Sequence, residues 1–68
     1  NYDEAAIMIK KAIDNGANSS AVILEHYGDV LWKLDRKEDA LDYWKKAKAA
    51  GEGSEFLDKK VEEKKMYV

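Results

Sequence analysis

Apolar side chains recur at intervals of three and four residues along most of this chain, with charged residues at many of the positions between them. Such spacing gives a helix one apolar face. Asn15-Gly16, Leu34-Asp35 and Gly51-Glu52-Gly53 interrupt the pattern, and glycine, asparagine and aspartate are common where helices end. The sequence therefore predicts an all-α fold of about four helices that pack in antiparallel pairs.

The first predicted helix begins with a capping box, in which Asn1 is the N-cap and Glu4 follows three residues later. Its main apolar stripe consists of Ala5, Ile9, Ala12 and Ile13. Ile7 and Met8 widen this stripe. Because apolar residues cover more of the circumference of this helix than one packing contact requires, we expect other helices to pack on two sides of it.

The second predicted helix follows Ser19 and Ser20, either of which is a suitable N-cap. Its inward face carries Leu24, Tyr27, Gly28, Leu31 and Leu34. Its opposite face carries Val22, Glu25, His26, Asp29 and Lys33. The pattern predicts that the first set is buried and the second is displayed to solvent.

Two further helices are predicted after the break at Asp35. The third runs from about Lys37 to Ala50, faces inward with Ala40, Leu41, Trp44 and Ala47, and ends at Gly51. The fourth begins after Ser54, with a narrow apolar stripe of Phe56, Leu57 and Val61 among many charges.

Gly28 is unusual because it lies inside a helical pattern, where glycine costs about 1 kcal/mol relative to alanine. A close approach between two helices explains it, with Ala40 and Ala47 as the small residues of the facing helix and Trp44 beside them. A large side chain at this position would then cost about 1–3 kcal/mol through overpacking. A phosphate-binding loop is not indicated, because no strand precedes Gly28 and no second glycine flanks it.

Two parts of the chain resemble each other at a constant offset of 35 residues. Tyr2-Asp3-Glu4-Ala5 corresponds to Lys37-Glu38-Asp39-Ala40, and Ile9-Lys10-Lys11-Ala12 corresponds to Trp44-Lys45-Lys46-Ala47. A period of this length is typical of helical repeat proteins, in which each unit is a helical hairpin.

Around this repeat the chain resembles the tetratricopeptide repeat family, whose pattern is W-x2-L-G-x2-Y followed by A-x3-F. Leu24, Tyr27, Gly28 and Leu31 match its first half, and Ala40, Trp44 and Ala47 match its second half. The resemblance implies the second helix of a preceding repeat at 1–18, one complete repeat at 19–53 and a capping helix at 54–68, as at the C-terminal end of a longer array. Asp35 replaces the turn glycine of the family, and Ala17 and Glu52 replace its inter-repeat proline.

The resemblance also implies where a ligand would bind, because tetratricopeptide arrays display the first helix of each repeat in a groove that holds peptides or partner helices. Carried over, that face contains Val22, Glu25, His26, Asp29, Trp32 and Lys33. Trp32 falls between the buried and displayed faces and fits either a groove wall or a filler between repeats. Some members of the family bind the C-terminal carboxylate of a peptide, which requires cationic or amide donors at the positions of Glu25 and Asp29. Because both residues are acidic, we expect a basic or amphipathic partner instead.

Composition excludes several other functions. The chain has 12 basic and 14 acidic residues, a balance that gives no sign of nucleic-acid binding, and it has no cysteine for thiolate chemistry. No apolar run reaches the length of a membrane span. His26 and Asp29 lie one turn apart, but the sequence places no third metal ligand near them. The lysine doublets are interleaved with acidic residues, which is typical of a solvated face. We therefore expect no metal, cofactor or catalytic site.

Together these patterns predict a non-enzymatic scaffold that binds a protein or peptide on its second helix. The alternative is a structural end-cap or self-association segment of an array, with no ligand of its own. Self-association is expected because a following helix pair cannot cover all of Ile7, Met8, Ile9 and Ile13, which favours a homodimer formed through the N-terminal helix.

Overall fold

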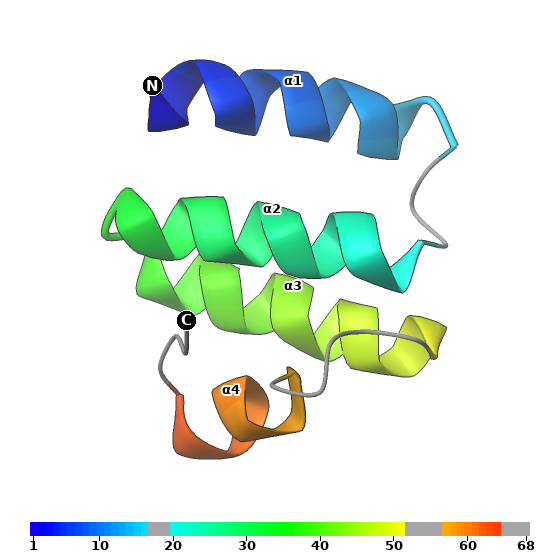
Figure 1. Ribbon diagram of the computed structural model, residues 1–68, viewed down its shortest axis with the longest axis vertical. Helices are drawn as coiled ribbons and strands as arrows, with labels where there is room; N and C mark the ends of the chain where they lie inside the picture. The colour runs from blue at the N-terminus through cyan, green and yellow to red at the C-terminus, as the bar shows by residue number, and fades with distance from the viewer. Residues whose placement is uncertain (17–19, 52–56, 65–68) are drawn as a thin grey trace.

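The computed structural model describes residues 1–16, 20–51 and 57–64, and all regular structure in these ranges is helical. The helices are α1 (Tyr2–Asp14), α2 (Ala21–Lys33), α3 (Lys37–Ala50) and α4 (Leu57–Glu63). Helices that follow one another in the chain contact each other, so α1, α2 and α3 lie side by side and the short α4 packs on α3 (Figure 1). The predicted all-α fold is confirmed. The predicted boundaries at 18/19 and 53/54, together with Ser19 and Phe56, lie outside the described residues.

Side-chain caps fix where the first two helices begin. The Asn1 carboxamide oxygen accepts hydrogen bonds from the backbone N–H groups of Asp3 and Glu4, at 3.0 and 3.2 Å. The Ser20 hydroxyl oxygen accepts one from the N–H of Ile23 at 3.4 Å. These bonds satisfy backbone donors that have no partner within the helix. The predicted caps Asn1 and Ser20 are confirmed.

The turn between α2 and α3 depends on a left-handed residue, Asp35, whose φ angle is 61°. The N–H of Asp35 bonds to the carbonyl of Trp32 at 3.0 Å, and the N–H of Arg36 bonds to that of Leu31 at 2.9 Å. This is the Schellman pattern, which usually has glycine at the left-handed position. Aspartate adopts that conformation at less cost than most residues, so it can replace the turn glycine of the family pattern.

The core lies mainly between α2 and α3. Its most deeply buried side chains are Leu31, Ala40, Trp44 and Ala47. Gly28 is buried against Trp44, and a Cβ atom at Gly28 would lie only 2.5 Å from Cδ1 of that indole and 3.1 Å from the carbonyl oxygen of Ala40. The predicted close approach at Gly28 is therefore confirmed.

The outer helix α1 buries only part of its apolar surface. Ala6 and Ile13 are buried against the core, while Ile7 is 58% and Met8 is 70% exposed. The prediction that one following helix pair cannot cover all of Ile7, Met8, Ile9 and Ile13 is confirmed, because the first two stay exposed. The predicted inward stripe is partly wrong, because Ala12 is exposed and Ala6, which was not assigned to it, faces the core.

Candidate functional site: the two edges of α2

The predicted ligand face of α2 is divided between two environments. Along one edge, Val22, His26 and Lys33 are exposed, with Val22 at 65%. Along the other edge Glu25 is only 5% exposed, and Asp29 is half-buried. The prediction that Glu25 and Asp29 are displayed to solvent is therefore wrong.

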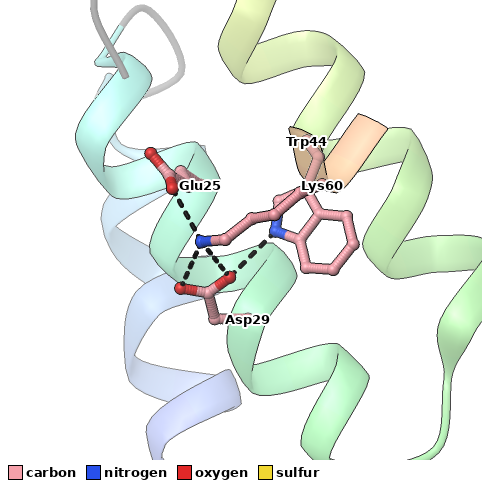
Figure 2. A network of polar contacts seen from close by, with 4 residues as sticks. All are labelled: Glu25, Asp29, Trp44 and Lys60. Atoms are coloured by element: carbon pink, nitrogen blue, oxygen red, sulfur yellow. Dashed lines mark hydrogen bonds and ion pairs between the residues drawn. The ribbon is translucent and has the colours of Figure 1, made fainter. Parts of the chain in front are cut away.

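Glu25 and Asp29 are covered because α4 folds back and inserts a lysine between them. The Lys60 ammonium donates to Oε2 of Glu25 at 2.7 Å and to Oδ1 and Oδ2 of Asp29 at 2.9 and 3.2 Å. Oδ1 of Asp29 also accepts a hydrogen bond from the Trp44 indole N–H at 3.0 Å. Figure 2 shows these four residues, called the Lys60 cluster below, with the ammonium between the two carboxylates.

The Lys60 cluster is a buried charge network. Lys60 is 3% exposed, and this burial alone would lower the pKa of its ammonium. Its hydrogen bonds to Glu25 and Asp29, and their negative charges, outweigh burial and leave the pKa above its ordinary value of 10.5. The charged lysine is thus the stable form at neutral pH. The cluster ties α4 to α2 and also orients the indole of Trp44.

This arrangement changes the partner chemistry expected from the sequence. An acidic face on α2 was the reason to expect a basic ligand, but the chain's own ammonium already occupies that face. One signal for this pairing was present in the sequence, because Glu25 and Lys60 lie 35 residues apart, which is the repeat offset, and carry opposite charges. The Lys59-Lys60 doublet instead suggested a solvated surface.

Trp32 packs within the helical hairpin. Its ring stacks on that of Trp44 with a centroid distance of 5.3 Å and an interplanar angle of 28°. The Lys37 ammonium lies 5.1 Å from the Trp32 ring centroid, a favourable cation–π distance. Trp32 is half-buried, and both of these contacts are within the chain.

The exposed edge of α2 forms one wall of an apolar groove, and α1 forms the other. This groove has a volume of about 300 Å³. It is called the α1/α2 groove below, and it is lined by Met8, Ile9, Ala12, Val22, Ile23 and His26. Val22 and His26 belong to the predicted ligand face. The contribution of α1 could not be predicted from the sequence pattern, because it depends on how α1 and α2 are placed against each other.

A larger hollow of about 730 Å³ lies where α1, α2 and α3 come together, and two lysines line it. Both of these lysines have partners. Lys10 donates to Asp14 at 2.7 Å, and the Lys46 ammonium lies 4.3 Å from the Tyr43 ring centroid. The hollow therefore does not present a pair of unengaged cations to an anion.

Within residues 1–16, 20–51 and 57–64, no three metal-binding side chains of histidine, cysteine, aspartate or glutamate come together. No helix in the same ranges has the length and apolar character needed to cross a membrane. Comparisons of the chain with protein-family models, curated proteins and solved structures found no match.

Proposed function

We propose that this chain is a non-enzymatic protein interaction module of the tetratricopeptide type, and that it binds a helix of a partner protein in the α1/α2 groove. The observation that carries the proposal is the groove itself, whose rim includes Met8 and Val22, each about two-thirds exposed or more. Exposed apolar surface of this kind is typical of protein contact sites, and grooves between helices commonly receive amphipathic helices. The resemblance of the sequence to a scaffold family supports the same function.

The exposed edge of α2 retains part of the predicted ligand face, with Val22 and His26 in the groove. The acidic part of that face is neutralised within the Lys60 cluster. We therefore propose apolar contacts, rather than charge attraction to a basic ligand, as the main source of affinity. High salt should then weaken binding only slightly, because screening acts on exposed charges and not on apolar contacts.

A pair of neighbouring substitutions tests this function. Met8→Lys places a charge in the α1/α2 groove, whereas Ile7→Lys alters an exposed apolar residue of the same helix that does not line it. Helical peptides are first selected from a displayed library for binding to the full chain, and their affinities are then measured by calorimetry. Met8→Lys should weaken binding at least about tenfold, and Ile7→Lys should have little effect. Equal binding to both variants would argue against the groove as the binding site.

Self-association is a second candidate, favoured by the adjacent exposure of Ile7 and Met8 on one helix. In this case the chain buries its N-terminal helix against another copy. Sedimentation from micromolar to near-millimolar concentration should show a dimer, which Ile7→Lys or Met8→Lys should dissociate. A monomer at all concentrations, with both variants unchanged in mass, would refute self-association. The structural end-cap function remains a further alternative, supported by the Lys60 cluster that holds α4 in place.

A further inference from the structure

A second hollow, of about 280 Å³, adjoins the larger hollow between α1, α2 and α3. The side chains of Lys10 and Asp14 line both hollows. The helix α2 contributes Leu24 to the larger hollow and Tyr27 to the smaller one, while α1 and the segment 36–50 flank them. The two hollows together are called the α1/α3 groove below, and their other charged or aromatic lining residues are Lys11, Arg36, Tyr43 and Lys46.

The α1/α3 groove lies on a different face of α1 from the α1/α2 groove. A helix packed on α1 as α2 packs on α3 would cover Ala5, Ile9 and Ala12, which are the counterparts of buried residues of α3 at the repeat offset. None of these three residues lines the α1/α3 groove. All the residues that form this groove therefore belong to the described part of the chain, and a helix in that position would not occupy it.

Positive charge predominates in the α1/α3 groove, although the whole chain has a formal net charge of −2. Four cationic side chains line the groove, and Asp14 supplies the one carboxylate of its lining. Lys10 and Arg36 each form an ion pair with a carboxylate of their own segment. Among the described residues, Lys11 and Lys46 have no carboxylate partner. The groove thus keeps two positive charges that the chain does not neutralise.

These two lysines occupy equivalent positions in α1 and α3. Lys11 and Lys46 are separated by the repeat offset of 35 residues, and each lines one of the two hollows. The Tyr43 ring attracts the Lys46 ammonium from 4.3 Å but carries no net charge to neutralise it. A ligand that lies along the groove therefore meets one available cation on each flanking helix.

The α2 side of the groove supplies apolar contact and one hydroxyl group. Leu24 is almost fully buried, and Tyr27 is 7% exposed with its ring edge-on to that of Tyr43 at a centroid distance of 4.5 Å. The Tyr27 hydroxyl forms no hydrogen bond within the described residues. Burial raises the pKa of this hydroxyl, and the nearby positive charges of Arg36 and Lys10 oppose that rise. A hydroxyl donor among cations suits an anionic group.

We propose that the α1/α3 groove binds an acidic segment of a partner protein in extended conformation. Side chains of an extended segment point alternately to two sides, so its carboxylates reach Lys11 on one helix and Lys46 on the other. The groove runs from Arg36 to Ala50, about 20 Å of helix, which accommodates about six extended residues. This site goes beyond the proposed function, because it is a second surface with a ligand of different chemistry.

A single-stranded nucleic acid is a poorer ligand for this groove. Bases bind by stacking on exposed aromatic faces, whereas Tyr27 is buried edge-on against Tyr43. Asp14 lines both hollows and would repel a continuous row of phosphates. A peptide avoids this repulsion because it can place an apolar residue beside Asp14.

Two neighbouring lysines of α3 test the proposal. Lys46 lines the groove, whereas Lys45 is exposed on the same helix and does not line it. The probe is the fluorescently labelled peptide Glu-Glu-Leu-Leu-Glu-Glu, titrated with the full chain at low salt and followed by fluorescence anisotropy. Lys46→Glu should weaken binding at least about fivefold and Lys45→Glu less than about twofold, although both change the net charge equally.

Three controls make the result decisive. High salt, or glutamine in place of every glutamate of the probe, should weaken binding, because both remove charge attraction. Met8→Lys should leave it unchanged, since Met8 lines only the α1/α2 groove. If Lys46→Glu lowers the Tm, Lys46→Gln is compared with Lys45→Gln instead. Equal losses at the two lysines would overturn the proposal, and so would a loss with Met8→Lys, no binding of the acidic probe, or tighter binding of a thymidine oligonucleotide.

Discussion

Replacing Lys60 with methionine should destabilise the chain by removing the ammonium at the centre of the Lys60 cluster. Methionine keeps most of the aliphatic length, so the main change is the loss of charge and hydrogen bonds. The Glu25 side chain is only 7% exposed, and it would remain buried without its ammonium partner. Breaking a buried ion pair from one side typically costs about 3–5 kcal/mol.

The expected cost here is somewhat smaller, because the second carboxylate has other sources of stabilisation. The Asp29 side chain is 28% exposed and keeps its hydrogen bond from the Trp44 indole. We therefore expect Lys60→Met to lower the free energy of unfolding by about 2–3 kcal/mol. In a domain of this size each kcal/mol shifts the Tm by about 4–8 °C, so the Tm should fall by roughly 8–24 °C.

Thermal unfolding followed by circular dichroism measures this shift, and Lys45→Met is the control. Lys45 is an exposed lysine of α3, and its replacement should change the stability by less than about 0.5 kcal/mol. The double variant Glu25→Met with Lys60→Met should recover much of the loss, because apolar replacement of a whole buried pair is often neutral. A Tm for Lys60→Met within about 2 °C of the control would refute the reasoning.

Three further predictions concern the hairpin, its turn and alkaline pH. Gly28→Ala should cost about 1–3 kcal/mol in urea unfolding, because the new Cβ displaces Trp44, and a stabilising effect would contradict the close approach. Asp35→Val should lower the free energy of unfolding by about 1–2 kcal/mol, because valine is strained at the positive φ of this position. Asp35→Gly should change it little, because glycine adopts positive φ without strain. Equal Tm values for the two variants would contradict this explanation of the turn. The raised pKa of Lys60 means that its stabilisation is complete below pH 10.5 and declines as pH rises through the raised value. Burial also raises the pKa of Tyr27, so this residue too makes the fold less stable as the pH rises. The free energy of unfolding should therefore be measured between pH 9 and 12 for the natural chain and for Lys60→Met, and the variant should lose less stability over this range.

Much of the fold could be predicted because its determinants are local. The spacing of apolar residues identified α3 with the same bounds, Lys37–Ala50, that the structure shows. The glycine at position 28, on the inward face of α2, predicted a close contact between two helices. The structure shows this contact, in which the side chain of Trp44 fills the space beside Gly28. These features depend on helix periodicity and on neighbouring helices joined by a short turn.

The error at Glu25 and Asp29 arose because burial of a polar face depends on distant parts of the chain. Helical periodicity assigns charged residues to the outside, and it carries no information about α4 returning over that face. Lys60 looks like any other lysine in a strongly charged segment, yet it is nearly fully buried. Predicting the cluster requires matching opposite charges across the repeat offset, which links positions on different helices.

The groove was only half predicted for a similar reason. Val22 and His26 were assigned to a displayed face, but a groove needs a second wall, and Met8 and Ile9 of α1 supply it. The sequence suggested that α1 had excess apolar surface. It did not show that this surface adjoins the exposed edge of α2, because that depends on how the two helices are placed against each other.

The charge pair between Glu25 and Lys60 has a consequence for symmetry. The two residues lie 35 residues apart, the offset that also separates the first residues of α1 and α3. If α4 repeated the sequence of α2 at this offset, a glutamate would stand at position 60 and would repel Glu25. The reversal of sign between the two positions replaces repulsion with attraction, and it also makes the two helices distinguishable. The helix that follows α3 is thereby selected by its charge as well as its shape, so another copy of α2 could not take the place of α4 without bringing two carboxylates together.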